Sequence, residues 1–350
     1  LTRSVSDGIR LFATALVLAV VTGISDIWTV VIIGVVTIVY TFFGGMTAVV
    51  WNDFIQLVIY VGGALLAFWF VLDRVPGGWG EVVSTAAPDG KLDFLNLNLN
   101  LTEPYTILAG LIGGAFLTFA THGTDQMMVQ RYLACGDRKK SQLALLVSGV
   151  IVALQFLLFL LLGVLLFAYY KHFPLQNELG HVNEILPTFI VQEMPPGVSG
   201  FIVAAIFAAA MSTLSSSLNS LSSSSLNDFY RARFVKGRSE SHYLAASRVL
   251  TLIWGILLIL VAVFARTQTD EVLQATLTIT SIPMGSMLGI FLLGTFHRRM
   301  TQTPGLLGMT AGLIVMIGVS QFTTIAWTWY VLIGTLCTVS AGLIAQRFSR

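Results

Sequence analysis

Residues 201–225 read FIVAAIFAAAMSTLSSSLNSLSSSS, so this segment begins as an apolar membrane helix and ends as a run of hydroxyl groups. No Gly or Pro interrupts the change. Side chains three and four residues apart share one face of a helix. Ser212, Ser215, Ser216 and Asn219 are therefore predicted to form one polar stripe, with Thr213 beside it.

Two interpretations of this stripe are open from the residues alone. Hydroxyl and carbonyl oxygens are ligands that a hard cation prefers, and transporters place ion sites near the middle of the bilayer. Small hydroxyl residues also line contacts between membrane helices, where they permit close approach and bond back to carbonyls one turn earlier. The stripe thus predicts either a cation site or a helix-packing surface.

The composition is typical of a protein that crosses the membrane many times. Of the 350 residues, 55% are hydrophobic and 10% are charged, whereas a soluble domain has about 25% charged residues. The net charge of +2 is too small to indicate nucleic acid as a partner. Cys135 and Cys337 are too few and too far apart for a metal motif or a disulfide framework. We expect an all-α, multi-pass protein of the cell membrane, surrounded by lipid and without an organic cofactor.

Ten apolar runs are long enough to cross about 30 Å of hydrocarbon. They cover roughly residues 9–25, 28–46, 53–72, 105–129, 143–170, 199–226, 243–265, 273–296, 305–323 and 325–346. If the N-terminal end is cytoplasmic, only four of the 19 basic residues face outward, namely Arg74, Lys91, Lys171 and Arg266. The positive-inside rule favours this orientation, with both ends of the sequence cytoplasmic. It predicts one transmembrane domain over residues 1–350, with external loops at about 73–104 and 171–198.

The connection between the second and third spans is short. In residues 42–53, Gly44 and Gly45 are expected to permit a tight reversal on the inner side. The connection would place Asp53 at the inner mouth of the third span. A carboxylate at membrane depth is costly unless a cation or another partner accompanies it, so Asp53 is predicted either to bind a cation or to cap the N-terminus of its span.

The fourth span carries several glycines and a polar inner half, 118–126, which indicate a broken helix that lines a cavity. Polar groups at membrane depth need partners. We therefore expect Thr118, Thr121 and His122, with Gln155 of the fifth span, to hold a small polar organic solute or organic anion between the fourth, fifth and eighth spans. For His122, the alternative is a neutral histidine that bonds to a neighbouring helix.

Three motifs, in order along the chain, resemble those of the sodium:solute symporter family. They are residues 42–56 (FFGGMTAVVWNDFIQ), 123–132 (GTDQMMVQRY) and 208–217 (AAAMSTLSSS). The resemblance implies sodium-coupled symport and the inverted-repeat fold of the leucine transporter. It also implies that the ten spans are core helices three to ten plus two C-terminal helices. The sequence is therefore expected to be N-terminally truncated and to lack the first two core helices.

The resemblance also implies which residues bind the coupling ion, Na⁺. At the sodium site common to the family, the carbonyl of Ala209 and the hydroxyls of Ser212 and Thr213 would be ligands. The missing first core helix would supply the others. The spacing agrees, because a carbonyl points toward side chains three and four residues later on a helix.

A second sodium ion would be bound by Asp53 with Ser215 and Ser216, as in family members that couple two sodium ions. The two serines lie one turn nearer the cytoplasm than Ser212, at a depth that Asp53 could share. No metal other than sodium is predicted.

Two other functional classes have weaker support. An intramembrane serine protease would need a histidine beside Ser199. By the charge count, His242 and His297 lie on the opposite side of the membrane, and His181 lies in an external loop without an orienting partner. No enzyme activity is therefore expected. A solute-sensing membrane domain of a signalling protein is the remaining alternative.

Overall fold

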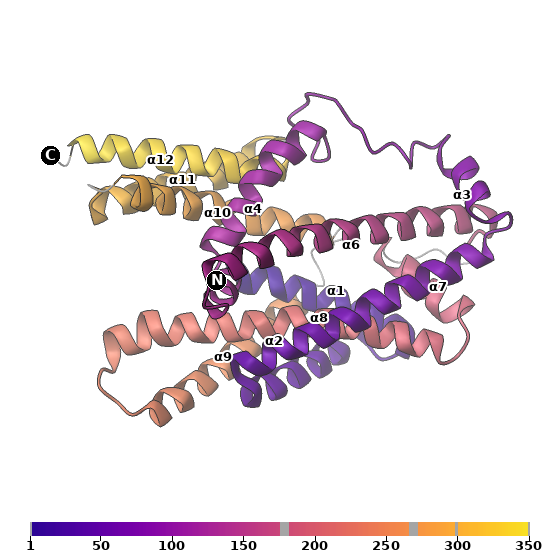
Figure 1. The fold of residues 1–350 in the computed structure, drawn as a ribbon, viewed down its shortest axis with the longest axis horizontal. Coiled ribbons are helices and arrows are strands. Elements are labelled where there is room, and N and C mark those ends of the chain that lie inside the picture. The colour runs from indigo at the N-terminus through magenta and orange to yellow at the C-terminus, as the bar shows by residue number, and fades with distance from the viewer. Residues whose placement is uncertain (1, 176–181, 266–271, 298–299, 349–350) are drawn as a thin grey trace. The chain divides into compact units, whose positions relative to one another are not determined.

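A computed structural model describes residues 2–175, 182–265, 272–297 and 300–348, apart from the side chains of residues 2–3, 44–48, 183 and 272–275. Arg266 and part of the second predicted external loop, including His181, lie outside these ranges. All regular elements in the described residues are helices (Figure 1). The α-helices are α1 (Thr2–Thr22), α2 (Asp26–Arg74), α3 (Gly78–Ala86), α4 (Gly114–Thr124), α5 (Gln126–Ala134), α6 (Arg138–His172), α7 (Ile185–Glu193), α8 (Val198–Ser224), α9 (Glu240–Ala265), α10 (Val272–Phe296), α11 (Gln302–Phe322) and α12 (Tyr330–Phe348). Short π- and 3₁₀-helical segments are η1 (Ala109–Gly113), η2 (Val182–Glu184), η3 (Ser225–Phe234) and η4 (Trp327–Trp329).

Nine helices in the described residues are long and apolar enough to cross a membrane. They correspond to nine of the ten predicted spans, although the first begins at Ser4 instead of residue 9. In the other predicted span, 105–129, η1 and α4 form one continuous helical stretch up to Thr124, and the helix is interrupted at Asp125 before α5 begins. The first predicted external loop contains α3, and the second contains η2 and α7.

The chain divides into two compact units. The first consists mainly of Arg3–Asp93 and Gln142–Val272, and the second of Phe94–Ser141 and Leu273–Arg350. Whether the two units act as the single transmembrane domain expected from the sequence stays a prediction.

In the first unit, α8 packs against α2 and α9 (Figure 1). Small residues allow the approach of α2 and α8, since a Cβ added at Gly63 would lie 2.5 Å from the Cβ of Ala205. Ile38, Leu218 and Leu258 form a buried apolar cluster of these three helices. This packing fixes which face of α8 meets α2, and thereby positions the polar stripe.

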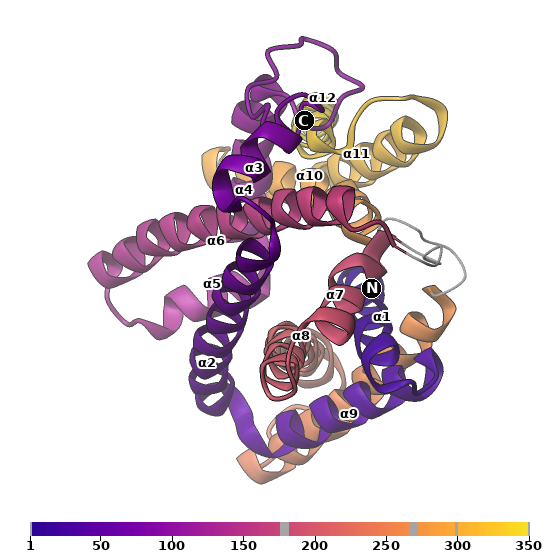
Figure 2. The same cartoon turned by 90° about the vertical axis from the view of Figure 1, so that its right-hand side faces the viewer.

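The predicted tight connection at residues 42–53 is wrong. Helix α2 is continuous from Asp26 to Arg74, and a straight helix of this length would measure about 74 Å, more than twice the hydrocarbon thickness. Figure 2 shows that α2 changes direction sharply between its two arms, which correspond to the second and third predicted spans. The glycines at 44 and 45 thus lie within a bent helix and not in a turn. Because no helix begins at Asp53, that residue is not an N-cap.

In the second unit, α11 and α12 pack side by side through small residues (Figure 1). A Cβ added at Gly308 would lie 2.7 Å from the carbonyl oxygen of Thr338, which shows how closely the two backbones approach. Helix α10 contains Pro283 without ending there. Met284 and Leu288 of α10 pack against Ala120 of α4 and Val331 of α12 in a buried cluster. This cluster packs α4, the helix that ends before Asp125, against α10 and α12.

Candidate ion and solute site

A carboxylate of α2 meets two hydroxyl groups of α8. The Ser212 hydroxyl donates to Asp53 Oδ1 at 2.6 Å, and the Ser216 hydroxyl donates to Asp53 Oδ2 at 2.9 Å. Ser212 and Ser216 are four residues apart and share one face of α8. Each carboxylate oxygen therefore has a hydroxyl partner from the polar stripe, and three oxygen-bearing side chains that a hard cation prefers are gathered together.

The residues predicted for the common sodium site lie on two successive turns of α8. Thr213 donates its hydroxyl to the carbonyl of Ala209 at 3.4 Å. Ala209, Ser212 and Thr213 are all half-buried, so their oxygens are not sealed inside a packed core. These three residues can therefore contact an ion from one side.

Ser215 differs from its neighbour Ser216. Its hydroxyl donates to the carbonyl of Ser212 at 3.1 Å, and both Ser215 and Ser216 are buried. Asp53 is thus contacted by Ser212 and Ser216, and the assignment of Ser215 to a second sodium ion stays a prediction. Since Ser212 contacts Asp53 and also belongs to the predicted common site, it links the two candidate sites, which the sequence did not indicate.

Two tyrosines of α2 complete the polar surroundings. Tyr40 donates its hydroxyl to the carbonyl of Met211 at 2.6 Å, and Tyr60 donates to Oε1 of Gln155 at 2.9 Å. A cavity of about 260 Å³ in the first unit is lined by residues of α1, α2, α6, α7 and α8, among them Tyr60 and Ala209. Neither of the two tyrosine contacts could be predicted from the residue pattern, although a tyrosine in an apolar span usually has a hydrogen-bond partner.

The break in the fourth predicted span is confirmed. The backbone leaves the helical conformation at Asp125, where ψ is 117°, and the Asp125 carboxylate accepts a hydrogen bond from the backbone N–H of Met127. His122 lies in α4, before the break, and Tyr132 lies in α5, after the break. The Nδ1 atom of His122 is 2.6 Å from the hydroxyl oxygen of Tyr132. The histidine therefore contacts the neighbouring helix α5 across the break, as the alternative interpretation of His122 expects.

The predicted solute residues fall into two groups. Thr118, Thr121 and His122 lie on one face of α4 in the second unit, where Thr118 is exposed and Thr121 donates to the sulfur of Met284 at 3.6 Å. Gln155 belongs to α6 in the first unit and is held by Tyr60. The first group therefore lies on α4 of the second unit, and Gln155 lies on α6 of the first unit.

Comparisons with known proteins agree with this fold. The model of the sodium:solute symporter family matches residues 6–312. The chain is 33% identical over 336 residues to the sodium/sialic acid symporter NanT of Aliivibrio fischeri, a match that covers 95% of the chain and 66% of NanT. It is 31% identical over 327 residues to the human sodium/iodide cotransporter, covering 91% of the chain and 50% of that protein.

A solved structure gives the same result. It shows the substrate-bound outward-open state of a Na⁺-coupled sialic acid symporter, with a TM-score of 0.86 and 30% identity over 99% of this chain and 74% of that chain. Fold and site thus define a multi-pass membrane protein of the leucine-transporter-like fold. The chain belongs to the sodium:solute symporter family. It spans about two thirds of the length of NanT and half that of the human cotransporter.

Proposed function

We propose that the full-length protein couples the movement of Na⁺ to the transport of a small polar organic solute or organic anion. The observation that carries the proposal is the pair of hydrogen bonds from Ser212 and Ser216 to Asp53, beside the half-buried oxygens of Ala209 and Thr213. A carboxylate among neutral oxygens suits a monovalent hard cation. Membership of the sodium:solute symporter family supports Na⁺ as that cation.

For the solute, we propose that Thr118, Thr121, His122 and Gln155 supply contacts. Their support is that each is a polar side chain on an apolar membrane segment, and that three of them share one face beside the break of a helix. The relatives include a carrier of sialic acid and one of iodide. An organic anion is consistent with the chemistry of the first.

Uptake by the full-length protein tests this proposal. Labelled sialic acid, sugars, amino acids and monocarboxylates are offered with sodium and with choline in its place, and we expect one class to accumulate only with sodium. His122→Ala and Thr121→Ala should each raise the KM of that solute roughly tenfold, the effect of losing one hydrogen bond to a buried partner. If both variants leave KM unchanged, the solute binds elsewhere, and uptake that ignores sodium contradicts symport itself.

Orientation in the membrane is a separate proposal. The charge asymmetry supports a cytoplasmic loop at Lys139 and an external position for Pro195, both exposed in the structure. The two free cysteines, Cys135 and Cys337, are first replaced by serine. In intact cells we expect an impermeant thiol reagent to modify Pro195→Cys and to modify Lys139→Cys only after the cells are permeabilised. Modification of Lys139→Cys from outside would invert the proposed topology.

A further inference from the structure

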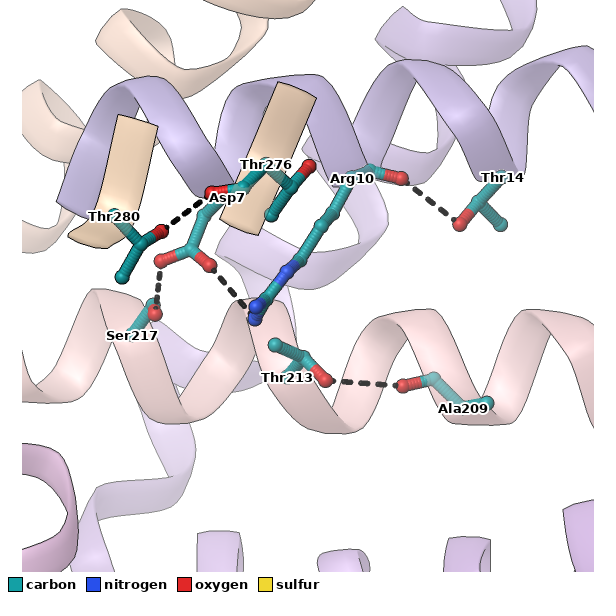
Figure 3. Close-up of polar contacts among 8 residues, drawn as sticks. All are labelled: Asp7, Arg10, Thr14, Ala209, Thr213, Ser217, Thr276 and Thr280. Atoms are coloured by element: carbon teal, nitrogen blue, oxygen red, sulfur yellow. Dashed lines mark hydrogen bonds and ion pairs between the residues drawn. The ribbon is translucent and has the colours of Figure 1, made fainter. Parts of the chain in front are cut away.

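A second carboxylate meets α8 from a different helix. Asp7 of α1 is fully buried, and so is Ser217, whose hydroxyl donates to Asp7 Oδ2. The other oxygen, Oδ1, lies 3.4 Å from Nη1 of Arg10, one turn further along α1. Figure 3 shows the guanidinium group of Arg10 reaching α8 between Ser217 and Thr213. An ion pair between a buried carboxylate and a guanidinium that is 39% exposed therefore lies against the same helix that carries the candidate sodium ligands.

The polar residues of α8 divide into two stripes. Ser212 and Ser216 are one turn apart and both donate to Asp53. Ala209, Thr213 and Ser217 follow one another at intervals of four residues, and Ser217 at the end of this stripe donates to Asp7. The common sodium site draws on both stripes. One stripe is thus joined to a carboxylate of α2 and the other to a carboxylate of α1.

The sign of the charge on Arg10 matters for an ion on α8. A fixed positive charge close to oxygens that would bind Na⁺ opposes binding, and partial burial limits how far water and salt screen the effect. Asp7 offsets this charge, since the carboxylate and the guanidinium lie side by side. Ion pairs add little net stability, whether they are exposed or buried, so stability alone does not account for placing this pair against the candidate ligands.

We propose that Asp7 and Arg10 set the sodium affinity of the site at Ala209, Ser212 and Thr213. Arg10 lowers the affinity for sodium, so that a bound ion can leave, and Asp7 limits this effect while fixing the stripe of Thr213 and Ser217 through its hydrogen bond. Asp7 and Arg10 are positioning residues in this scheme and not ligands. The inference rests on the proposed sodium-coupled transport.

The test compares three variants of the full-length protein, Arg10→Gln, Asp7→Asn and the double variant. The readouts are the sodium concentration that half-saturates uptake at saturating solute, and the solute KM at saturating sodium. Arg10→Gln should lower the half-saturating sodium concentration on the order of tenfold, and Asp7→Asn should raise it by a similar factor. The double variant should return to within about threefold of the wild type. In all three, the solute KM should change less than the sodium dependence.

The outcomes separate this inference from its alternatives. A purely structural ion pair would make both single variants worse in the same direction, and such a result overturns the inference. Arg74→Gln is the matched control, because it removes a cation from an ion pair with Glu193, 2.7 Å away, at the far end of α2. It should leave the sodium dependence unchanged. If Asp7→Asn does not fold, Arg10→Gln must still bind sodium more tightly than the wild type. A wild-type protein without sodium dependence would instead refute the proposed function.

Discussion

Asp53→Asn is expected to abolish the coupling of a second sodium ion. The wild-type protein should show a sodium Hill coefficient above one and move about two sodium ions with each solute molecule. The variant keeps the shape of the side chain but removes its negative charge, and an amide nitrogen replaces one of the two oxygens that accept hydroxyl bonds from Ser212 and Ser216. The Hill coefficient and the coupling ratio should both fall toward one, as measured by paired uptake of labelled sodium and labelled solute in vesicles.

The neighbouring serines refine this expectation. A hydrogen bond to a charged group contributes about 1.5–3 kcal/mol, or roughly a ten- to hundredfold change in binding. Ser216→Ala should therefore weaken sodium activation more than Ser215→Ala does, because the hydroxyl of Ser215 donates to a carbonyl of its own helix. The double alanine variant should behave like Asp53→Asn. Asp93→Asn, an exposed residue in the first predicted external loop, is the control and should change nothing. A wild-type coupling ratio of one would rule out the second ion.

The location of the candidate site could be predicted, because it depends on depth along helices. The polar stripe lies on α8 as expected, and Asp53 is level with it, since both positions follow from counting residues along apolar spans. The break at Asp125 could likewise be predicted, because polar and glycine-rich sequence within a span disfavours a continuous helix.

The partners of individual hydroxyls could not be predicted. Ser215 and Ser216 differ by about 100° of rotation around α8, and only the packing of α8 on α2 decides which of them meets Asp53. The position of Arg10 beside α8 could not be predicted either, because nothing in its local sequence shows that α1 lies against α8. The tight turn predicted at residues 42–53 failed for a related reason, since glycine permits a reversal but does not require one.

Thr213→Ala and Ser212→Ala are expected to weaken sodium activation far more than solute recognition at saturating sodium. Thr213→Ala removes one candidate ligand, and the sodium concentration that half-saturates uptake should rise roughly tenfold. Thr213→Ser keeps the hydroxyl and serves as the control, with a sodium dependence near that of the wild type. Measuring uptake over a range of sodium concentrations, at several fixed solute concentrations, separates the two affinities.

Ser212→Ala should have the larger effect, because its hydroxyl also donates to Asp53 at 2.6 Å. Removing it takes a ligand from the first proposed ion and a hydrogen bond from the carboxylate proposed for the second. We therefore expect Ser212→Ala to raise the half-saturating sodium concentration and to lower the Hill coefficient, whereas Thr213→Ala should raise the concentration alone. Equal Hill coefficients in the two variants would mean that Ser212 does not link two ion sites. An unchanged sodium dependence in both variants would mean that the first sodium site does not lie on α8.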